Sequence, residues 1–199
     1  KYENNLETVE LISNRAMRYV MRHIPNTENP FDDYFPWYIL LEVSNTEIDE
    51  FNGELMGYLE SSYIDNAIVA KNIREKQSLW RIRHSISEAQ KKEGASIKHD
   101  ISVPISSIIE FIGKAEQKVQ ELLPGAKVVS FGHVGDGGVH FNVTQPKDFA
   151  IEEFNKYRKK ISSAVYACAK QFNGSISAEH GIGVFKKEDL IKYKSNLEI

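Results

Sequence analysis

The sequence has little of what would mark a secreted, membrane-spanning or nucleic-acid-binding protein. Its 199 residues include one cysteine, Cys168, so an internal disulfide is excluded and a reducing compartment is expected. There is no apolar run of about 18 residues and no signal-like start, which predicts neither a membrane span nor secretion. The formal net charge is −3, so no general basic field would attract nucleic acid. The composition is typical of a soluble, cytoplasmic enzyme domain.

Apolar residues recur at alternating strand and helix spacings, and the order of these segments predicts an α+β fold. We expect a mainly antiparallel sheet with helices covering one side. Thr46 and Asp49 form a plausible capping box for one helix. Cys168 falls on the apolar side of another helix, which favours a core thiol. The expected helices are 2–23, one following Thr46, 73–90, 106–123 and 151–172, and the expected strands are 37–43, 67–70, 97–103 and a hairpin in 127–144.

The hairpin carries one histidine on each strand. A type I′ turn centred on Asp136 and Gly137 would place His133 directly opposite His140, with Cβ atoms about 5 Å apart. This separation suits two nitrogen ligands on one metal ion, each at about 2.0–2.1 Å. Alternation puts Asn142 on the same face as the histidines. A two-residue register slip would separate the rings, and histidines on strands are commonly half-buried and bonded to backbone.

A third metal ligand and a base stand later in the sequence. Glu179 and His180 follow a short predicted strand, 174–178, and precede a glycine turn. Two histidines and a carboxylate form a common ligand set for a catalytic metal, which predicts a site of His133, His140 and Glu179. His180 is then placed to act as a base beside the metal. The plainer alternative is that Glu179 ends a strand in solvent and the glycines form an ordinary turn.

A second group of polar residues is basic. Arg81, Arg83 and His84 lie on the helix after Trp80, and Lys98 lies on the strand that follows. A guanidinium that grips a carboxylate through two hydrogen bonds would anchor an acidic substrate. On the residues alone, solvated charges on an exposed helix are the favoured reading.

The motifs together resemble a known family. They are similar to the C-terminal domain of FAD-linked oxidases, flavoproteins of the vanillyl-alcohol oxidase superfamily that include D-2-hydroxyacid dehydrogenases. The paired-histidine and Glu-His-Gly motifs are specific in combination, and the similar segments cover nearly the whole chain in the family's order. These segments are FPWYILLEVS (35–44), LWRIRHSISEA (79–89), IKHDISVP (97–104), FGHVGDGGVHFNV (131–143) and ISAEHGIGVFK (176–186).

The resemblance implies two ferredoxin-like halves and a substrate site. The positions that match the family's substrate-contacting residues are Arg83, Ser87, Lys98 and Asn142. Gly138 departs from the family pattern, which usually has asparagine at this position. FAD would be bound mainly by an N-terminal domain that this sequence does not include, so we expect a C-terminal fragment that does not turn over substrate alone. In a eukaryote the expected location becomes the mitochondrial matrix.

The leading hypothesis is therefore the substrate- and metal-binding domain of an FAD-dependent D-2-hydroxyacid dehydrogenase. Zn²⁺ is the expected metal, and an electron acceptor would reoxidise the flavin. Two cationic anchors, Arg83 and Lys98, favour a substrate with a second carboxylate, such as D-2-hydroxyglutarate. A homodimer is compatible with the sequence. The alternatives are a non-catalytic ferredoxin-like ligand-binding module and an iron oxygenase with two histidine ligands and one carboxylate.

Overall fold

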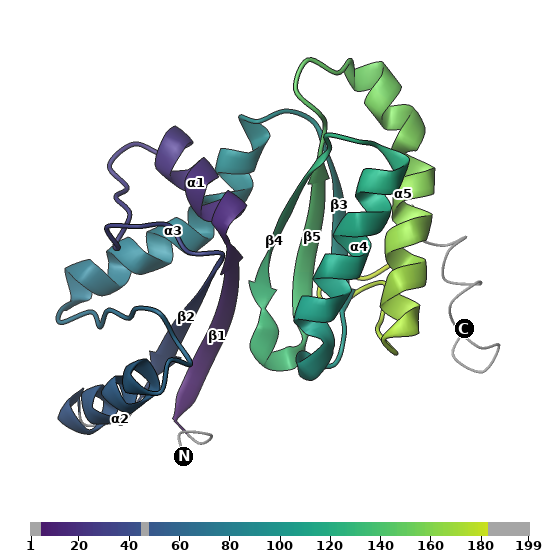
Figure 1. The fold of residues 1–199 in the computed structure, drawn as a ribbon. Coiled ribbons are helices and arrows are strands. Elements are labelled where there is room, and N and C mark those ends of the chain that lie inside the picture. The colour runs from purple at the N-terminus through teal and green to yellow at the C-terminus, as the bar shows by residue number, and fades with distance from the viewer. Residues whose placement is uncertain (1–4, 45–47, 183–199) are drawn as a thin grey trace.

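The chain forms one antiparallel sheet with helices on both faces (Figure 1). The computed structural model describes residues 5–44 and 48–182. Within these residues the sheet has five strands in the order β2-β1-β4-β5-β3, and all four neighbouring pairs are antiparallel. The strands are β1 (Leu6–Ser13), β2 (Trp37–Val43), β3 (Ser96–Ser102), β4 (Lys127–His133) and β5 (Gly138–Thr144). The α-helices are α1 (Asn14–His23), α2 (Ile48–Glu60), α3 (Ile73–Lys91), α4 (Ile108–Leu122) and α5 (Ile151–Gln171).

One face of the sheet is mainly apolar where α4 and α5 cover it, and its buried polar residue His99 contacts Ser162 of α5. Every second residue of β5 points into this core, and Phe141 and Val143 are wholly buried against the two helices. Phe111 of α4 and Phe154 of α5 fill the space between the layers. Burying side chains of this size removes enough apolar surface from water to stabilise the layer by about 1.5–3 kcal/mol each. The packing of α4 and α5 therefore stabilises this face of the sheet.

The opposite face is partly covered by α1 and α3, which pack together over β1 and β4. Ile12, Val129 and Phe131 of the strands meet Val20 of α1 and Ile86 of α3 in a second core. The prediction that helices cover one side only is therefore wrong. The reason lies in β4, where both Val128 and Val129 are buried, one in each core, so both faces of this central strand need a covering layer.

Most of the predicted elements are present, and the α+β class is confirmed. The strand 37–43 and the helices near 73–90, 106–123 and 151–172 occur within two residues of their predicted bounds. The predicted helix 2–23 is wrong in its first half, because β1 occupies Leu6–Ser13 before α1 begins. Residues 67–70 form no strand. Thr46 lies outside the described residues, and the duplicated ferredoxin-like halves stay a prediction.

The N-terminal misassignment has a clear local cause. Ser13 has an extended backbone, and its hydroxyl accepts a hydrogen bond from the Ala16 amide, so it caps α1. Leu11 and Ile12 fit the helical spacing of the residues that follow, so the sequence does not show where the strand ends. They fit a strand equally well, because each is buried on a different face of the sheet. Pairing with β2 and β4 therefore decides the conformation of this segment.

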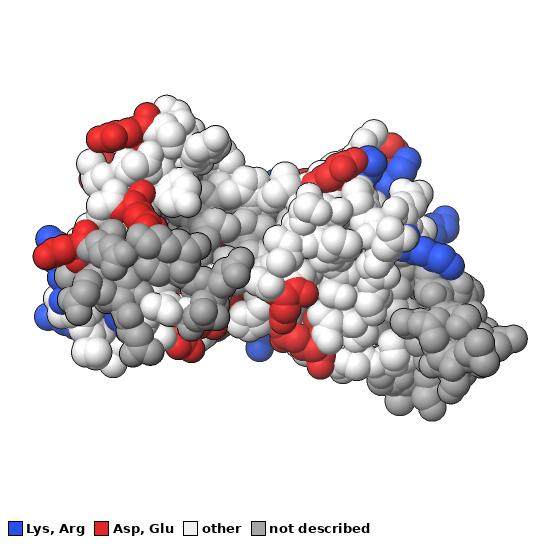
Figure 2. Space-filling model, turned by 90° about the horizontal axis from the view of Figure 1, so that it is seen from below, with Lys and Arg blue, Asp and Glu red and all other residues white. Residues whose placement is uncertain are grey.

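Three further observations bear on the sequence-based expectations. Cys168 is buried in the core on α5, and burial raises the pKa of its thiol, as expected of a structural cysteine. On the face seen in Figure 2, acidic side chains lie both on the left and near the middle, and most of the lysines and arginines lie at the left and right edges. Among the described residues, no helix combines the length and apolar character needed to cross a membrane.

Candidate functional site

The β4–β5 hairpin turns differently from the prediction. A short 3₁₀ turn, Val134–Asp136, is followed by Gly137 with φ of 86°. The resulting register places Phe131, and not His133, opposite His140. The predicted direct pairing of the two histidines is therefore wrong.

The neighbouring strand explains why the turn takes this form. The Gly137 carbonyl accepts a hydrogen bond from the Val103 amide at 3.1 Å, which draws the turn against the end of β3. A Cβ atom at Gly137 would lie 2.3 Å from the Val103 carbonyl oxygen, so only glycine fits. The longer loop moves His133 two residues along the ladder from the position opposite His140.

The polar residues still share one face of the sheet, the face that α1 and α3 cover in part. In one row across the strands, Glu10 of β1 pairs with His133 of β4. In the next row, Ile12 pairs with Phe131, Phe131 with His140, and His140 with Asp100 of β3. The strand pairing therefore places both histidines on adjacent rows of one surface.

Glu10 lies beneath His133. Its carboxylate is 1% exposed, and its two oxygens lie 2.6 Å from Nδ1 of His133 and 2.6 Å from Nε of Arg83. Nε2, the other ring nitrogen of His133, lies 3.8 Å from Oε1 of Glu179. The structure thus brings together two of the predicted metal ligands, and His133 presents one nitrogen to Glu179.

Asp100 positions the segment that carries Glu179 and His180. Its Oδ2 accepts hydrogen bonds from the amides of Ala178 at 3.1 Å, Glu179 at 2.9 Å and His180 at 2.8 Å. An ordered turn replaces the predicted strand 174–178, and the only ladder contact among its described residues is the bridge between Ser102 and Ser175. One buried carboxylate therefore fixes three consecutive main-chain groups above the sheet.

The closest group of potential metal-binding atoms is not the predicted one. Among the described residues, Asp100, His140 and His180 offer ligand atoms that all lie within 4.8 Å of one another. The rings of His140 and His180 stack at 5.4 Å between centroids. His140 belongs to both this group and the predicted set, and the role of His180 as a base beside the metal stays a prediction.

His140 is the more buried of the two hairpin histidines, and this affects its protonation. Burial lowers the pKa of His140, and the positive charge of Arg83 lowers it further, while Glu179 and Asp100 act in the opposite direction. The net pKa lies below the ordinary value of 6.5. At neutral pH the ring is therefore uncharged and has a lone pair that can bind a metal ion.

The predicted substrate-contacting residues occupy different environments. Arg83 is held by Glu10 and lies over the Phe131 ring at 4.9 Å, close to the histidines. Lys98 is exposed and pairs with Asn142 across the β3–β5 ladder. Asn142 itself is buried and donates a hydrogen bond to Gln90 of α3 at 2.9 Å. Ser87, one helical turn after Arg83, is exposed.

Gly138 lies in the hairpin between two acidic side chains. Its amide donates to Asp136 Oδ1 at 3.0 Å, so the loop closes without a side chain at position 138. A Cβ atom placed there would lie 3.9 Å from Glu179 Oε1. The same Cβ atom would lie 3.0 Å from Asp136 Oδ1 and 3.3 Å from the His133 carbonyl oxygen, so a side chain at this position would crowd the hairpin turn.

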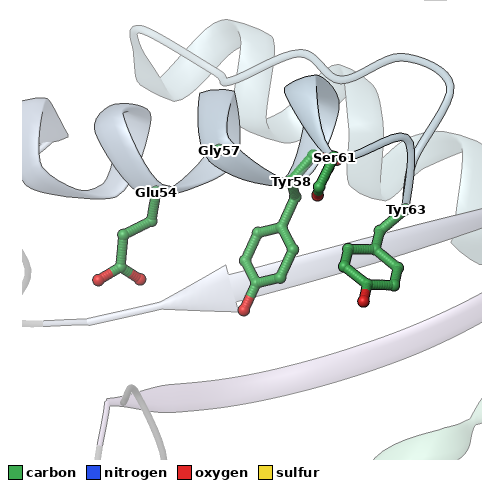
Figure 3. A pocket seen from close by; sticks show the side chains of 5 residues that line it. All are labelled: Glu54, Gly57, Tyr58, Ser61 and Tyr63. Atoms are coloured by element: carbon green, nitrogen blue, oxygen red, sulfur yellow. The ribbon is translucent and has the colours of Figure 1, made fainter.

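A surface hollow occurs elsewhere, at the C-terminal end of α2. It has a volume of about 370 Å³ and is lined by Glu54, Gly57, Tyr58, Ser61 and Tyr63 (Figure 3). The two tyrosines point to the same side, with their rings 6.5 Å apart, and Tyr63 is 80% exposed. Its described lining includes no histidine and none of the predicted site residues.

Two residues of the site were not recognised from the sequence. Glu10 stands in the segment predicted as a helix, so nothing placed it beside His133. Asp100 lies on β3, and its contact with His180 joins residues 80 positions apart, which no local pattern reveals. The usable signal is a carboxylate in a strand that also contains Ile97 and Ile101, because a carboxylate in a buried strand needs hydrogen-bonding partners.

The fold and site together define a class of protein. An antiparallel sheet, covered by helices, presents imidazoles and carboxylates suited to a metal ion, with an arginine close to them. This arrangement defines the chain as an α+β domain with a candidate metal- or ligand-binding site.

The comparison with known sequences agrees with this class. The chain belongs to the family of FAD linked oxidases, C-terminal domain, which it matches over residues 2–199. It is 33% identical to the mitochondrial D-2-hydroxyglutarate dehydrogenase of Arabidopsis thaliana, with 96% of this chain and 33% of that protein covered. The corresponding protein of Danio rerio is 34% identical, with 97% and 35% covered. A putative mitochondrial D-lactate dehydrogenase of Schizosaccharomyces pombe is 32% identical, with 92% and 36% covered. The chain thus spans about a third of the length of these relatives.

Proposed function

We propose that the chain is the substrate- and metal-binding domain of an FAD-dependent enzyme that oxidises a D-2-hydroxyacid to the 2-oxoacid. The observation that carries this proposal is the polar cluster at one end of the sheet, where His133, His140, Glu179 and His180 lie with Arg83 beside them. FAD would be bound mainly by an N-terminal domain, within the two thirds of the relatives' length that this chain does not cover. Such a domain alone would not turn over substrate.

The metal ligands in this proposal are His133, His140 and Glu179. Two imidazoles and one carboxylate suit Zn²⁺ and leave positions for substrate. Glu179 is 41% exposed in its side chain, and its Oε1 faces Nε2 of His133, so it can shift to complete a coordination sphere. Oδ2 of Asp100 is already committed to three main-chain amides. Oδ1 of Asp100 lies 3.8 Å from Nδ1 of His140, which makes Asp100 the competing carboxylate ligand.

The chain's own residues would bind and orient the substrate and move one proton. Arg83 and Lys98 would attract its carboxylates, and Asn142 lies in the same row as Lys98. His180, exposed and stacked on His140, would accept the proton of the substrate 2-hydroxyl. When bound, Zn²⁺ would supply Lewis acidity to the 2-hydroxyl and carboxylate. When bound, FAD would supply the acceptor for the hydride on Cα.

A dicarboxylic substrate such as D-2-hydroxyglutarate is the preferred candidate, although its electrostatic support is weaker than expected. The surplus of positive charge assumed from Arg83 and Lys98 is reduced, because Glu10 pairs with Arg83 at 2.6 Å. Exposed Lys98 remains available on the polar face. Support now comes mainly from relatives named D-2-hydroxyglutarate dehydrogenases. The relative named a putative D-lactate dehydrogenase makes D-lactate the competing substrate.

The reaction class is tested by metal removal from the full-length enzyme. We expect purified protein to show flavin absorbance and to lose reduction of an electron acceptor after chelation, with recovery when Zn²⁺ is added. Equal activity before and after complete metal removal would eliminate the metal's role. Iron dependence with oxygen consumption and no flavin would favour the oxygenase alternative. Loss of stability without any change of activity in His133→Ala would favour a non-catalytic module.

The ligand set is tested by zinc affinity in single variants. His133→Ala and Glu179→Gln should each weaken zinc binding strongly, because each removes one of three protein ligands. Asp100→Asn, which keeps an oxygen to accept main-chain hydrogen bonds, should weaken it much less. The reverse order would assign the metal to Asp100, His140 and His180, the group whose donor atoms lie closest in this structure.

The substrate is tested by kcat/KM for D-2-hydroxyglutarate and D-lactate in the wild type, Arg83→Ala and Lys98→Ala. A charged hydrogen bond to the distal carboxylate is worth about 1.5–3 kcal/mol, or about ten- to a hundredfold in specificity. We expect Lys98→Ala to reduce kcat/KM for D-2-hydroxyglutarate by this factor and to affect D-lactate less. An equal loss for both substrates in both variants would remove the basis for a dicarboxylate preference.

The location and partners follow from the same proposal. We place the protein in the cytoplasm, or in the mitochondrial matrix of a eukaryote, because the plant and fish relatives are named mitochondrial. An electron acceptor downstream of FAD is required for repeated turnover. A homodimer stays a prediction.

A further inference from the structure

Glu10 is a deeply buried carboxylate that none of the proposed roles uses. Its side chain is 1% exposed, and each of its oxygens has a different cationic or potentially cationic partner. Oε1 lies 2.6 Å from Nδ1 of His133, and Oε2 lies 2.6 Å from Nε of Arg83. An ionised carboxylate is seldom buried unless such partners satisfy both oxygens. The position therefore has a defined set of contacts that only a carboxylate can complete.

The contact with His133 determines which ring nitrogen faces Glu179. A carboxylate oxygen only accepts hydrogen bonds, so Nδ1 of His133 must carry the proton that it donates to Glu10. In the neutral ring the lone pair then lies on Nε2, which is the nitrogen that points toward Glu179 at 3.8 Å. Pairing of Glu10 with His133 across the β1–β4 ladder keeps the ring in this orientation. Histidine ligands of metal ions are commonly oriented by a carboxylate in this way.

The contact with Arg83 links a second functional residue to the same carboxylate. Glu10 takes the Nε donor, and the guanidinium lies over the Phe131 ring, 4.9 Å from its centroid. These two contacts hold the guanidinium through Nε and against the Phe131 ring, and its two terminal nitrogens take no part in the 2.6 Å contact with Glu10. A single side chain on β1 thus lies in contact with a proposed metal ligand and a proposed substrate anchor.

We propose that Glu10 is a positioning residue that holds His133 in the metal-binding tautomer and orients Arg83 toward the substrate. This inference rests on the proposed function, because it takes His133 as a metal ligand. It assigns to β1 a role in the site, where the other site residues come from α3, β3, β4, β5 and the turn at 178–180.

The test compares Glu10→Gln with a matched control in the full-length enzyme. The amide of glutamine can accept a bond from His133 or from Arg83 through its one oxygen, but it presents a donor to the other partner. We expect zinc affinity, measured by competition with a chromophoric chelator, to fall by about 10- to 100-fold. The KM for the hydroxyacid should rise as well, because Arg83 loses its fixed orientation.

Glu93→Gln is the control because Glu93 has the same kind of environment at the other end of β4. Its carboxylate binds Arg22 and His23 of α1 and reaches Lys127 of β4 at 3.5 Å. The control variant should lose stability, as Glu10→Gln does, but keep its zinc affinity and KM. Equal losses of zinc affinity in the two variants would show that a general loss of stability is responsible, and the proposal would be wrong.

A double variant separates a role through His133 from any other effect. If Glu10 acts through His133, then Glu10→Gln should not weaken zinc binding further in a His133→Ala background. An equal fall in zinc affinity in both backgrounds would overturn the positioning role. If His133→Ala weakens zinc binding and Glu10→Gln does not, this inference fails while the proposed metal site stands. If His133→Ala leaves zinc affinity unchanged, the metal site fails and the inference fails with it.

Discussion

Replacement of Asp100 by alanine should release the turn that carries Glu179 and His180. Three main-chain amides donate to Oδ2 at 2.8–3.1 Å, and each such bond to an ionised acceptor contributes about 1.5–3 kcal/mol. The full sum will not be observed, because residues 178–180 are exposed and their amides can bond to water once the turn opens. Removing the carboxylate also relieves the cost of its own burial. We therefore expect the free energy of opening to fall by about 2–3 kcal/mol.

Amide hydrogen exchange of the full-length protein measures this opening directly. A loss of about 2 kcal/mol corresponds to about 30-fold faster exchange, and it should be confined to peptides that contain residues 178–180. Asp100→Asn should show a smaller effect, since its amide oxygen can still accept hydrogen bonds. Lys98→Ala is the control, because Lys98 lies on the same strand and face but is exposed. Unchanged exchange at 178–180 in Asp100→Ala would refute the reasoning.

Two further predictions concern stability, measured by urea denaturation. A Cβ atom at Gly174 would lie 2.3 Å from the carbonyl oxygen of Ser102, so Gly174→Ala should destabilise by about 1–3 kcal/mol. Gly113→Ala, in helix α4 with no atom within 4 Å of the added carbon, should stabilise by about 0.5–1 kcal/mol; effects of the same sign in both variants would contradict this expectation. Burial raises the pKa of the Glu93 carboxyl, but hydrogen bonds from His23 and an arginine outweigh it and hold the pKa below its ordinary value of 4.5. Because the folded-state pKa is lowered, this stabilisation is present above the unfolded-state pKa and is lost as pH falls through the folded-state pKa. Glu93→Gln should thus cost about 1–2 kcal/mol at pH 7, since its arginine partner is exposed, and the cost should disappear in acid; a cost independent of pH would contradict it.

The helices with a clear apolar stripe were predictable from the sequence alone. In α5, positions such as Phe154, Ile161 and Val165 recur at helical spacing and are all wholly buried. Helix α4 shows the same agreement through Ile112, Ala115 and Val119, and its end before Pro124 follows from local chain chemistry. Each of these helices packs one face against one core, so the spacing of its apolar residues shows which face is buried.

Elements that take their conformation from distant partners were not predictable. The segment 6–13 has a spacing compatible with a helix, and only its pairing with β2 and β4 makes it a strand. The hairpin has Asp-Gly at its turn, a strong local signal for a two-residue loop. A hydrogen bond from Val103 to Gly137 nevertheless stabilises a longer turn, and the register shifts as a result.

The sequence by itself determined the α+β class and the family, and it supplied the residue types of the candidate site, because these depend on local patterns and on motifs that lie close together in the chain. Only the tertiary structure placed Glu10 under His133 and fixed the 178–180 turn on Asp100, through contacts between residues about 80 or more positions apart in the chain. A buried carboxylate is stable only where partners complete its hydrogen bonds, and its own sequence neighbours do not reveal which strand or turn supplies them. The sequence therefore indicates which residue types form the candidate site, whereas the fold decides which of these residues contact one another.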